Sequence, residues 1–191
     1  VGAEGLSLLK EALLHVPENI TRIENGTSMR FTFVCKIFRA LASNREIATN
    51  LKDKEIKLLC LFLESYCSEF LNVPTPTTTC QSIWSLTQDE GTYFNGFLTP
   101  PVRNCLDSEK LLTMHNKPSK ATLFTLEGPV PCTKITLECR DCSVRYGIVK
   151  FLRSCEPGSG FYPNEYRIGV IEVSNVTYIN RKLYDWIPSL R

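Results

Sequence analysis

The sequence has little histidine, little net charge and no long apolar run, and each shortage argues against a class of protein. Its 191 residues include only two histidines, and no G-x-S-x-G, H-E-x-x-H or phosphate-loop motif occurs in them. Apolar residues never run long enough to cross a membrane, so we expect no membrane partner. We therefore expect that this chain is not an enzyme and does not span a membrane.

The net charge of +2 is too small to indicate that the whole chain binds a polyanion. The charge is uneven, however, because residues 1–100 hold nine Lys and Arg against eleven Asp and Glu, whereas residues 101–191 hold thirteen against nine. A hydrophobic content of 43% and a charged content of 22% are typical of a folded globular protein. The mildly basic second half permits contact with nucleic acid.

Cysteine, in contrast, is abundant, with nine residues. An odd number argues against a secreted scaffold in which every cysteine is disulfide-bonded. Cys35, Cys60 and Cys67 fall in predicted helices with apolar faces, where buried free thiols are common. The chain has no initiating methionine and no signal-peptide pattern, so we expect a segment of a longer intracellular protein.

The first part of the chain is predicted to be a helical bundle. Apolar residues recur at spacings of three and four in residues 5–16, 28–42 and 51–71, which is typical of helices with one buried face. A Thr-rich stretch with two prolines follows and lacks this periodicity, which indicates a linker. We therefore place a helical domain at residues 1–72 and a linker with a lead-in at residues 73–97.

The remaining residues, 98–191, are predicted to form a β-rich domain. Four segments alternate apolar and polar side chains or are rich in β-branched residues, which predicts strands: residues 120–126, 133–138, 146–152 and 166–179. A turn is expected at residues 127–131, because proline cannot donate a hydrogen bond to a sheet. Asn180 is expected to cap a final helix. The predicted fold class is therefore α+β.

Cys139 and Cys142 form a C-x2-C motif at the end of a predicted strand. A turn of this spacing directs both sulfurs to one side, where two thiolates can bind one tetrahedral zinc ion. A ribbon site needs a second such pair, and upstream Cys105 and Ser108 have the same spacing. Because a serine hydroxyl stays protonated near neutral pH and is a poor zinc ligand, the upstream pair offers only one thiolate.

Four segments together resemble the cysteine-cluster domain that accompanies Kyakuja–Dileera–Zisupton (KDZ) transposases: Cys105-Leu-x-x-x-x-Leu, Ala121 to Pro131, Leu137-x-Cys-x-x-Cys-x-x-x-Tyr146 and Phe161-Tyr-Pro163. The resemblance spans about residues 98–186. It implies a zinc-binding module beside the catalytic region of a transposase, with a role in DNA binding and a nuclear location. We therefore expect an N-terminal helical bundle followed by a β-rich, zinc-ribbon-like domain, with any catalytic carboxylates of a parent transposase outside this chain.

The family pattern has a C-x2-C pair at both ends of the hairpin, so this chain needs a replacement for one ligand. Cys155, Cys132 or Cys80 could supply a fourth thiolate, and His115 could complete a mixed site. We favour Cys155, because a strand and a loop can return it to Cys142. The predicted ligands of a Zn²⁺ cofactor are therefore Cys105, Cys139, Cys142 and Cys155. The alternative is that these cysteines bind no metal and that a hydrophobic core alone stabilises the domain.

A basic surface is predicted beside the C-x2-C motif. Its members are Arg140, Arg145, Lys150 and Arg153, with Tyr146 and Phe151 between them. Basic side chains contact phosphates and aromatic rings stack on bases, so we predict DNA as a partner, together with other parts of a longer parent chain. Alternatively, the basic side chains project from the solvated faces of two strands, and the aromatic rings belong to the core. The second function considered is a protein-interaction or structural module that binds neither metal nor nucleic acid.

Overall fold

The protein has an α+β fold. The computed structural model describes residues 2–66, 96–154, 158–166 and 168–186. The chain divides into two compact units, Val1–Asn95 and Gly96–Arg191. Within the described residues, three helices belong to the first unit, whereas the second unit is mostly β with one short α-helix and a 3-10 helix, η2 (Asn164–Tyr166). No described helix has both the length and the apolar character needed to cross a membrane.

The expected linker and lead-in at residues 73–97 lie almost entirely outside the described residues. The predicted domains at residues 1–72 and 98–191 therefore stay predictions.

The described part of the first unit consists of three helices and a short hairpin. The helices are α1 (Ala3–His15), α2 (Met29–Asn44) and α3 (Asp53–Tyr66), and the hairpin pairs β1 (Ile23–Glu24) with β2 (Thr27–Ser28). Asn25 and Gly26 join the two strands with φ angles of 50° and 76°, as a type I′ turn requires. The three predicted helices are confirmed, apart from residues 67–71, which lie outside the described part of the chain.

The apolar faces of the three helices supply the core of the first unit. Its fully buried side chains include Leu8, Leu9, Ile37, Phe38, Leu41 and Ile56. Arg30 of α2 forms an ion pair with Glu64 of α3. Cys35 and Cys60 are buried free thiols, as predicted, and burial is the main cause that raises the pKa of each to about 12. Cys67 lies outside the described residues.

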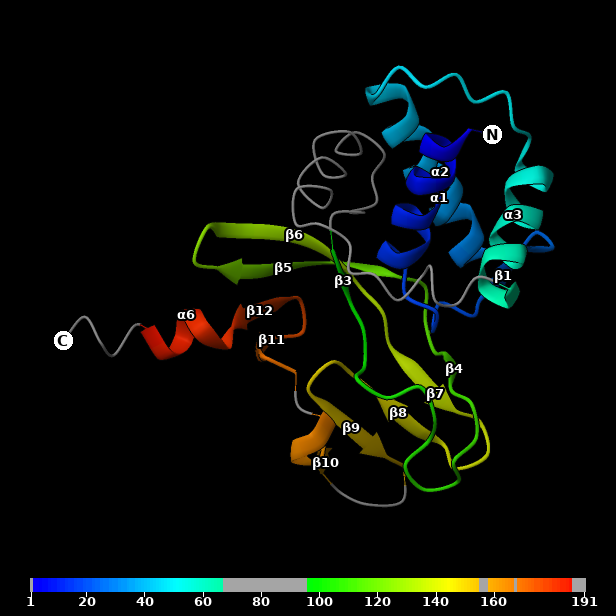
Figure 1. The fold of residues 1–191 in the computed structure, drawn as a ribbon. Coiled ribbons are helices and arrows are strands. Elements are labelled where there is room, and N and C mark those ends of the chain that lie inside the picture. The colour runs from blue at the N-terminus through cyan, green and yellow to red at the C-terminus, as the bar shows by residue number, and fades with distance from the viewer. Residues whose placement is uncertain (1, 67–95, 155–157, 167, 187–191) are drawn as a thin grey trace. The chain divides into compact units, whose positions relative to one another are not determined.

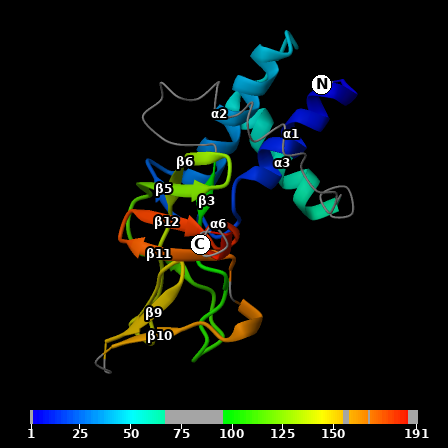
Figure 2. The same cartoon turned by 90° about the vertical axis from the view of Figure 1, so that its left-hand side faces the viewer.

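The second unit is built from two five-stranded sheets (Figure 1). In order across it, the first sheet contains β10 (Ser159–Phe161), β9 (Lys150–Arg153), β8 (Val144–Tyr146), β7 (Leu137–Cys139) and β4 (Thr113–Met114). The second contains β11 (Val170–Ser174), β12 (Thr177–Asn180), β5 (Ser119–Thr125), β6 (Gly128–Lys134) and β3 (Phe97–Leu98). We call them the cysteine sheet and the hairpin sheet. Figure 2 shows β12 between β11 and β5 in the hairpin sheet.

The turn predicted at residues 127–131 is wrong, because β6 already begins at Gly128 and pairs along its whole length with β5. The main-chain N–H groups of Thr133 and Ile135 donate to oxygens of the β3 segment, both at 2.8 Å. Strand residues two apart direct their N–H groups to the same side. Pro129 and Pro131 therefore face the side of β6 where no described strand pairs with them, and their missing N–H groups break no ladder.

Two predicted strands are each divided in the structure. Residues 133–138 contribute to both sheets, because β6 ends at Lys134 and β7 begins at Leu137. Residues 146–152 reverse direction at Gly147, whose N–H donates to the Lys150 oxygen at 2.9 Å. Apolar residues continue through both breaks, so the sequence pattern does not reveal where the chain leaves one strand for the next.

The C-terminal predictions are confirmed. Residues 166–179 contain two strands, β11 and β12, joined by a tight turn. A short helix follows, α6 (Arg181–Trp186), and the Asn180 Oδ1 atom accepts the Lys182 N–H at 2.9 Å. Asn180 therefore caps this helix as expected.

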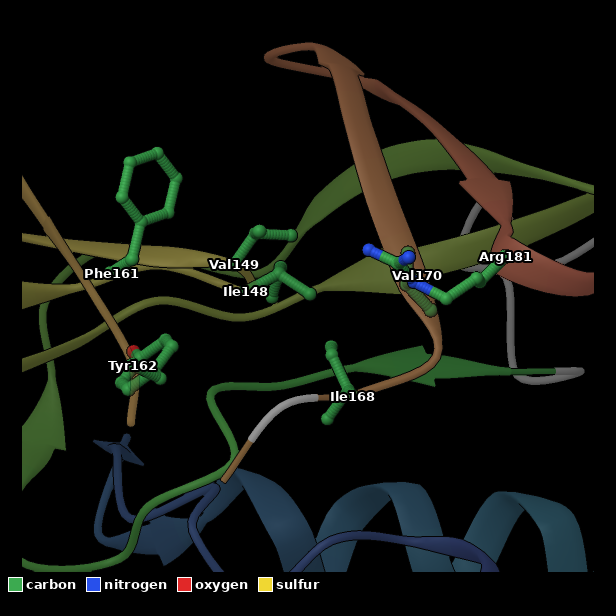
Figure 3. A pocket seen from close by; sticks show the side chains of 7 residues that line it. All are labelled: Ile148, Val149, Phe161, Tyr162, Ile168, Val170 and Arg181. Atoms are coloured by element: carbon green, nitrogen blue, oxygen red, sulfur yellow. The ribbon is translucent and has the colours of Figure 1, made fainter. Parts of the chain in front are cut away.

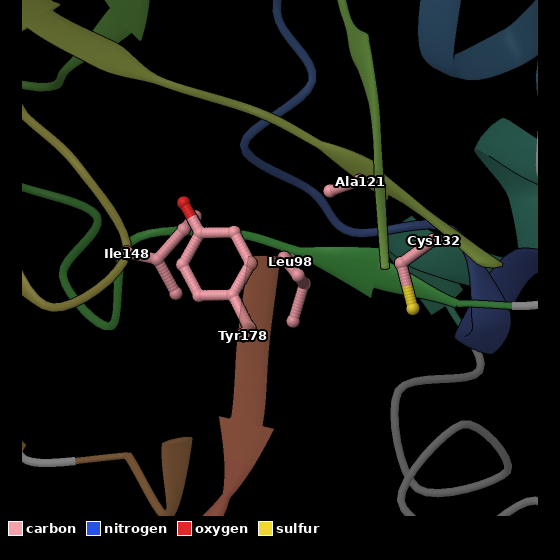
Figure 4. Close-up of a cluster of buried hydrophobic side chains, with 5 residues drawn as sticks. All are labelled: Leu98, Ala121, Cys132, Ile148 and Tyr178. Carbon is pink, nitrogen blue, oxygen red and sulfur yellow. The ribbon is translucent and has the colours of Figure 1, made fainter. Parts of the chain in front are cut away.

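A hydrophobic cluster joins the hairpin sheet to the loop that follows β8. Its buried members are Leu98, Ala121, Cys132, Ile148 and Tyr178 (Figure 4). Ile148 comes from the loop after β8, and the other four come from strands of the hairpin sheet. Burial raises the pKa of the Cys132 thiol to about 11. This cysteine therefore behaves as a core residue.

Gly160 of β10 lies in a closely packed part of the cysteine sheet, and a substitution at this position tests the packing. It lies opposite Phe151, and an added Cβ would be 2.5 Å from two carbons of that ring, which also packs against Tyr146 and Tyr162. We expect Gly160→Ala to lower the free energy of unfolding by about 1–3 kcal/mol, as overpacked cores do, measured by urea denaturation. The control is Gly169→Ala, where no atom of the described residues, apart from Gly169 and its two chain neighbours, lies within 4 Å of the added Cβ. Equal effects of the two substitutions would contradict this packing.

Candidate metal centre

Three cysteine sulfurs of the second unit lie close together. The Sγ atoms of Cys105, Cys139 and Cys142 are all within 4.8 Å of one another; the first two residues are buried and the third is half-buried. Sulfurs that share one tetrahedral zinc ion lie about 3.8 Å apart, because a Zn–S bond is about 2.3 Å long. The three thiols are therefore positioned to hold a metal ion. We call them the cysteine cluster.

Two turns with related backbone geometry supply these sulfurs. One turn contains residues 105–108 and the other contains residues 139–142. In both, the residue that follows has a left-handed conformation, with φ angles of 57° at Glu109 and 54° at Ser143. Ser108 therefore occupies the position in the first turn that Cys142 occupies in the second.

The Ser108 hydroxyl belongs to the same group of atoms. Its Oγ lies 3.5 Å from the Cys139 Sγ, and it also hydrogen-bonds to the sulfurs of Cys105 and Cys142. A neutral hydroxyl is not among the usual ligands of a structural zinc site, which are thiolate, imidazole and carboxylate. Within the described residues, the cluster thus offers three thiols and one hydroxyl.

Electrostatics favours a thiolate at Cys105. Burial opposes ionisation of this thiol, but hydrogen bonds from the Ser108 and Tyr146 hydroxyls and from main-chain N–H groups outweigh burial and lower its pKa to about 6. The buried thiols of Cys35 and Cys132 show the opposite shift, to about 12 and about 11. Cys105 therefore differs from the core cysteines in its chemistry rather than in its burial.

Cys142 has a raised pKa, in contrast. The Ser108 hydroxyl lowers it, but burial and the neighbouring sulfurs of Cys139 and Cys105 together outweigh that hydrogen bond. One negative charge in the cluster thus disfavours a second one. A divalent cation would remove this repulsion and displace the remaining thiol protons.

Tyr146 of β8 connects the cluster to the sheet beneath it. Its hydroxyl donates to the Cys105 Sγ at 3.2 Å and accepts the Leu106 N–H at 2.9 Å. Its ring is buried and packs against Phe151 and Tyr162, with centroid distances of 5.7 and 6.4 Å. Tyr146 and Phe151, which we considered for base stacking, are therefore core residues.

Two ion pairs also fix the first turn. The Arg153 Nε and Nη2 atoms donate to the two carboxylate oxygens of Asp107 at 3.0 and 2.6 Å, which ties the turn to β9. Lys110 forms an ion pair with Asp141 of the second turn. The pKa of Lys110 is raised, first by Asp141 and further by the charges of the cluster. The two ligand-bearing turns are thus linked to each other without any ion.

The four basic residues predicted to contact nucleic acid lie in three places. Arg140 is exposed in the second turn, and Arg153 is the partner of Asp107. Arg145 lies opposite Leu152, so it shares a face of the cysteine sheet with Lys150. The structure therefore brings together Arg145 and Lys150 but does not place all four residues on one surface.

The proposed fourth ligands are also separated. Cys132 belongs to the core of the hairpin sheet, and the His115 Nδ1 atom lies 2.6 Å from the Glu138 Oε2 atom rather than in the cluster. Cys155 and Cys80 lie outside the described residues, so the role of Cys155 stays a prediction.

Sequence reasoning set Ser108 aside as a ligand, although its spacing already placed it in the cluster. It also missed the role of the Tyr146 hydroxyl.

A family model described as the CxC5 like cysteine cluster associated with KDZ transposases matches residues 95–190. This range contains the whole cysteine cluster and both sheets. The resemblance derived from the sequence is therefore confirmed. Comparison with curated proteins found no match, and comparison with solved structures found none either.

The Tyr146 hydroxyl can be tested without disturbing the ring. We expect Tyr146→Phe to weaken zinc affinity by about 10- to 100-fold, because Cys105 loses a donor that favours its thiolate. Affinity is measured by competition with a chromophoric chelator. The control is Tyr162→Phe, which removes a hydroxyl from the same aromatic group, one that donates to the Gly147 oxygen at 2.7 Å and not to a sulfur. Equal affinities of the two variants would show that the hydroxyl does not support the cluster.

Proposed function

The chain belongs to the family of CxC5 like cysteine clusters associated with KDZ transposases, and from this premise we propose that it is a non-catalytic, zinc-binding accessory part of a transposon-derived protein. The observation that carries the proposal is the convergence of Cys105, Cys139 and Cys142 from two related turns. Catalysis by a parent transposase would then depend on residues outside this chain.

Zinc suits this donor set, because thiolates are soft ligands and structural zinc sites are tetrahedral and rich in cysteine. Cys105, Cys139 and Cys142 would hold the ion. When bound, the ion supplies a crosslink between two turns and no reaction step. The fourth ligand is proposed to be Cys155, with Ser108 as the nearest alternative. Two turns that present ligands toward one point support a zinc-ribbon-like arrangement.

Contact with DNA is the second part of the proposal. Arg145 is exposed, and Lys150 lies on the same face of the cysteine sheet. Basic side chains that project from one sheet face can contact successive phosphates of a nucleic-acid backbone. The positive balance of the second half of the sequence favours the same partner. A nuclear location accords with this role.

One observation favours the alternative of a protein-interaction module. Four large apolar side chains of α3 are exposed at helical spacing: Leu58, Leu61, Phe62 and Tyr66, with 67%, 49%, 53% and 79% of their surface accessible. An apolar stripe of this kind can dock a partner helix or another part of the parent chain. This alternative predicts an interaction that neither requires metal nor responds to added DNA.

Metal content tests the first part of the proposal. We expect elemental analysis of the purified chain to give one zinc ion per chain, and chelator to lower the thermal stability of the second unit, since binding of a structural ion contributes to folding. Cys139→Ser should abolish the stoichiometric zinc. The control is Cys35→Ser, the same change at a buried thiol outside the cluster, which should leave zinc content unchanged. Absence of zinc from the unsubstituted chain would favour the alternative function.

Ser108 provides a gain-of-function test. If the first turn presents position 108 to the ion, Ser108→Cys should complete a four-thiolate site and raise zinc affinity at least tenfold. Cobalt substitution should then show the stronger sulfur-to-metal charge-transfer absorption of an added thiolate ligand. The control is Ser119→Cys, which adds a thiol at an exposed strand end away from the cluster. An unchanged cobalt spectrum in Ser108→Cys would show that this position does not ligate the ion.

Salt dependence tests the contact with DNA. For a duplex, log K falls with log salt concentration by about 0.9 for each phosphate neutralised, so the double variant Arg145→Gln with Lys150→Gln should lower this slope by nearly two. The charge-matched control is Lys52→Gln with Lys54→Gln, two exposed residues beside and in α3 of the first unit. Equal slopes for the two double variants would show that DNA does not contact this face.

A further inference from the structure

A polar cavity of about 320 Å³ lies at the junction of the two sheets of the second unit. Its walls include side chains from both sheets, among them Lys134 of β6, Arg145 of β8 and Glu172 of β11. This volume is within the usual range of small-molecule sites, about 300–1,000 Å³. None of the three clustered cysteines lines it, so the cavity is a separate feature from the candidate metal centre.

The charges around the cavity favour an anion. Lys134, Arg145 and Lys150 all line it, whereas Glu172 is the single carboxylate among its described lining residues. Glu172 lies 3.6 Å from the Lys150 ammonium, which compensates one of the three positive charges. The Arg145 side chain forms no ion pair with any residue that the structure describes. Glu138 lies opposite Arg145 in the sheet, but its Oε2 atom contacts the His115 Nδ1 atom at 2.6 Å. Lys134 and Arg145 are therefore the two basic side chains of the lining that form no ion pair with a described residue.

Lys134 is held at the cavity by neutral groups. Its Nζ donates to the main-chain oxygen and the Oδ1 of Asn175, at 2.8 and 2.5 Å, and lies 5.9 Å from the centre of the Tyr178 ring. Burial lowers the pKa of this ammonium; Glu172 opposes that effect and Lys150 adds to it. An anion bound beside Lys134 would reduce the free-energy cost of keeping this partly buried ammonium charged.

Tyr178 provides an independent sign of a ligand. Its side chain is completely buried and lines the cavity, yet its hydroxyl has no hydrogen-bond partner among the described residues. Figure 4 shows the Tyr178 ring beside Ile148, another residue of the cavity wall. A buried hydroxyl without a partner is costly, and an oxygen of a bound ligand would satisfy it.

A neighbouring pocket shows why the polar cavity is the better candidate. That pocket has a volume of about 210 Å³ and is lined by aliphatic and aromatic side chains, with Arg181 as its one charged group among the described residues (Figure 3). It offers neither a group of like charges nor a buried hydroxyl that lacks a partner. The polar cavity offers both.

We propose that this cavity binds a phosphate monoester, either a free mononucleotide or the phosphorylated end of a nucleic-acid strand. A monoester carries close to two negative charges at neutral pH and can contact both Lys134 and Arg145, whereas an internal diester carries only one. Arg145 and Lys134 would contact the phosphate, and the Tyr178 hydroxyl would hydrogen-bond to the ligand. Only the strand-end source rests on the proposed function, because a mononucleotide site requires no contact with DNA.

Calorimetric titration of the 191-residue chain with adenosine 5′-monophosphate, inorganic phosphate and adenosine tests the inference. The first two should bind and adenosine should not. Arg145→Gln and Tyr178→Phe should each weaken binding of the monophosphate by about tenfold or more. Tyr178→Phe removes no hydrogen bond within the described structure, so thermal unfolding should confirm that this variant is folded. The control, Tyr162→Phe, should bind the monophosphate normally.

Oligonucleotides with a 5′-phosphate or a 5′-hydroxyl distinguish the two sources. Tighter binding of the phosphorylated strand that is lost in Tyr178→Phe identifies the strand end, and monophosphate binding without this preference identifies the free mononucleotide. The inference is overturned if neither the monophosphate nor inorganic phosphate binds, or if both substitutions leave binding unchanged. In that case, salt-dependent binding of an unphosphorylated strand would still support the proposed function, so the two failures are distinguishable.

Discussion

The Tyr146 hydroxyl is the contact on which the candidate metal centre depends. It accepts the Leu106 N–H at 2.9 Å and donates to the Cys105 Sγ at 3.2 Å, so one buried oxygen fixes both the main chain and the sulfur of the first turn. The first turn lies outside the sheets, and main-chain hydrogen bonds between Cys105 and both Lys110 and Glu109 also hold it. Because the ring packs among Phe151 and Tyr162, the core of the cysteine sheet determines where Cys105 lies.

This arrangement of sulfurs favours a bound cation. Without a cation, ionised sulfurs of the cluster repel one another. Sulfurs within 4.8 Å of one another cannot all be thiolates unless a positive charge lies among them. Hydrogen bonds lower the pKa of Cys105, whereas burial and the neighbouring sulfurs raise that of Cys142. The ion pair of Arg153 with Asp107 ties the first turn to β9, and that of Lys110 with Asp141 ties it to the second turn. Exposed pairs of this kind contribute little stability individually, so their main effect is to restrict geometry.

Sequence reasoning identified the α+β fold, the three helices of the first unit and three of the cluster residues, because those features depend on local periodicity and spacing. It failed where the outcome depends on which sheet a segment joins. From sequence alone, Pro129 and Pro131 indicate a turn, because the sequence does not show that their side of β6 is unpaired. The sequence also contains no local signal that marks where β6 ends and β7 begins. The roles of Ser108 and Tyr146 were missed for the same reason, since both depend on contacts made across the fold.

Strand β8 carries both sites because its residues alternate between two faces of one sheet. Val144 is buried on the side of the cluster, whereas Arg145 projects from the opposite face into the polar cavity. Tyr146 follows, with its hydroxyl at Cys105, and is also among the residues that line the cavity. A shift of Tyr146 would therefore alter the sulfur and the cavity together. Because β8 has only three residues, both sites depend on the position of the same short segment.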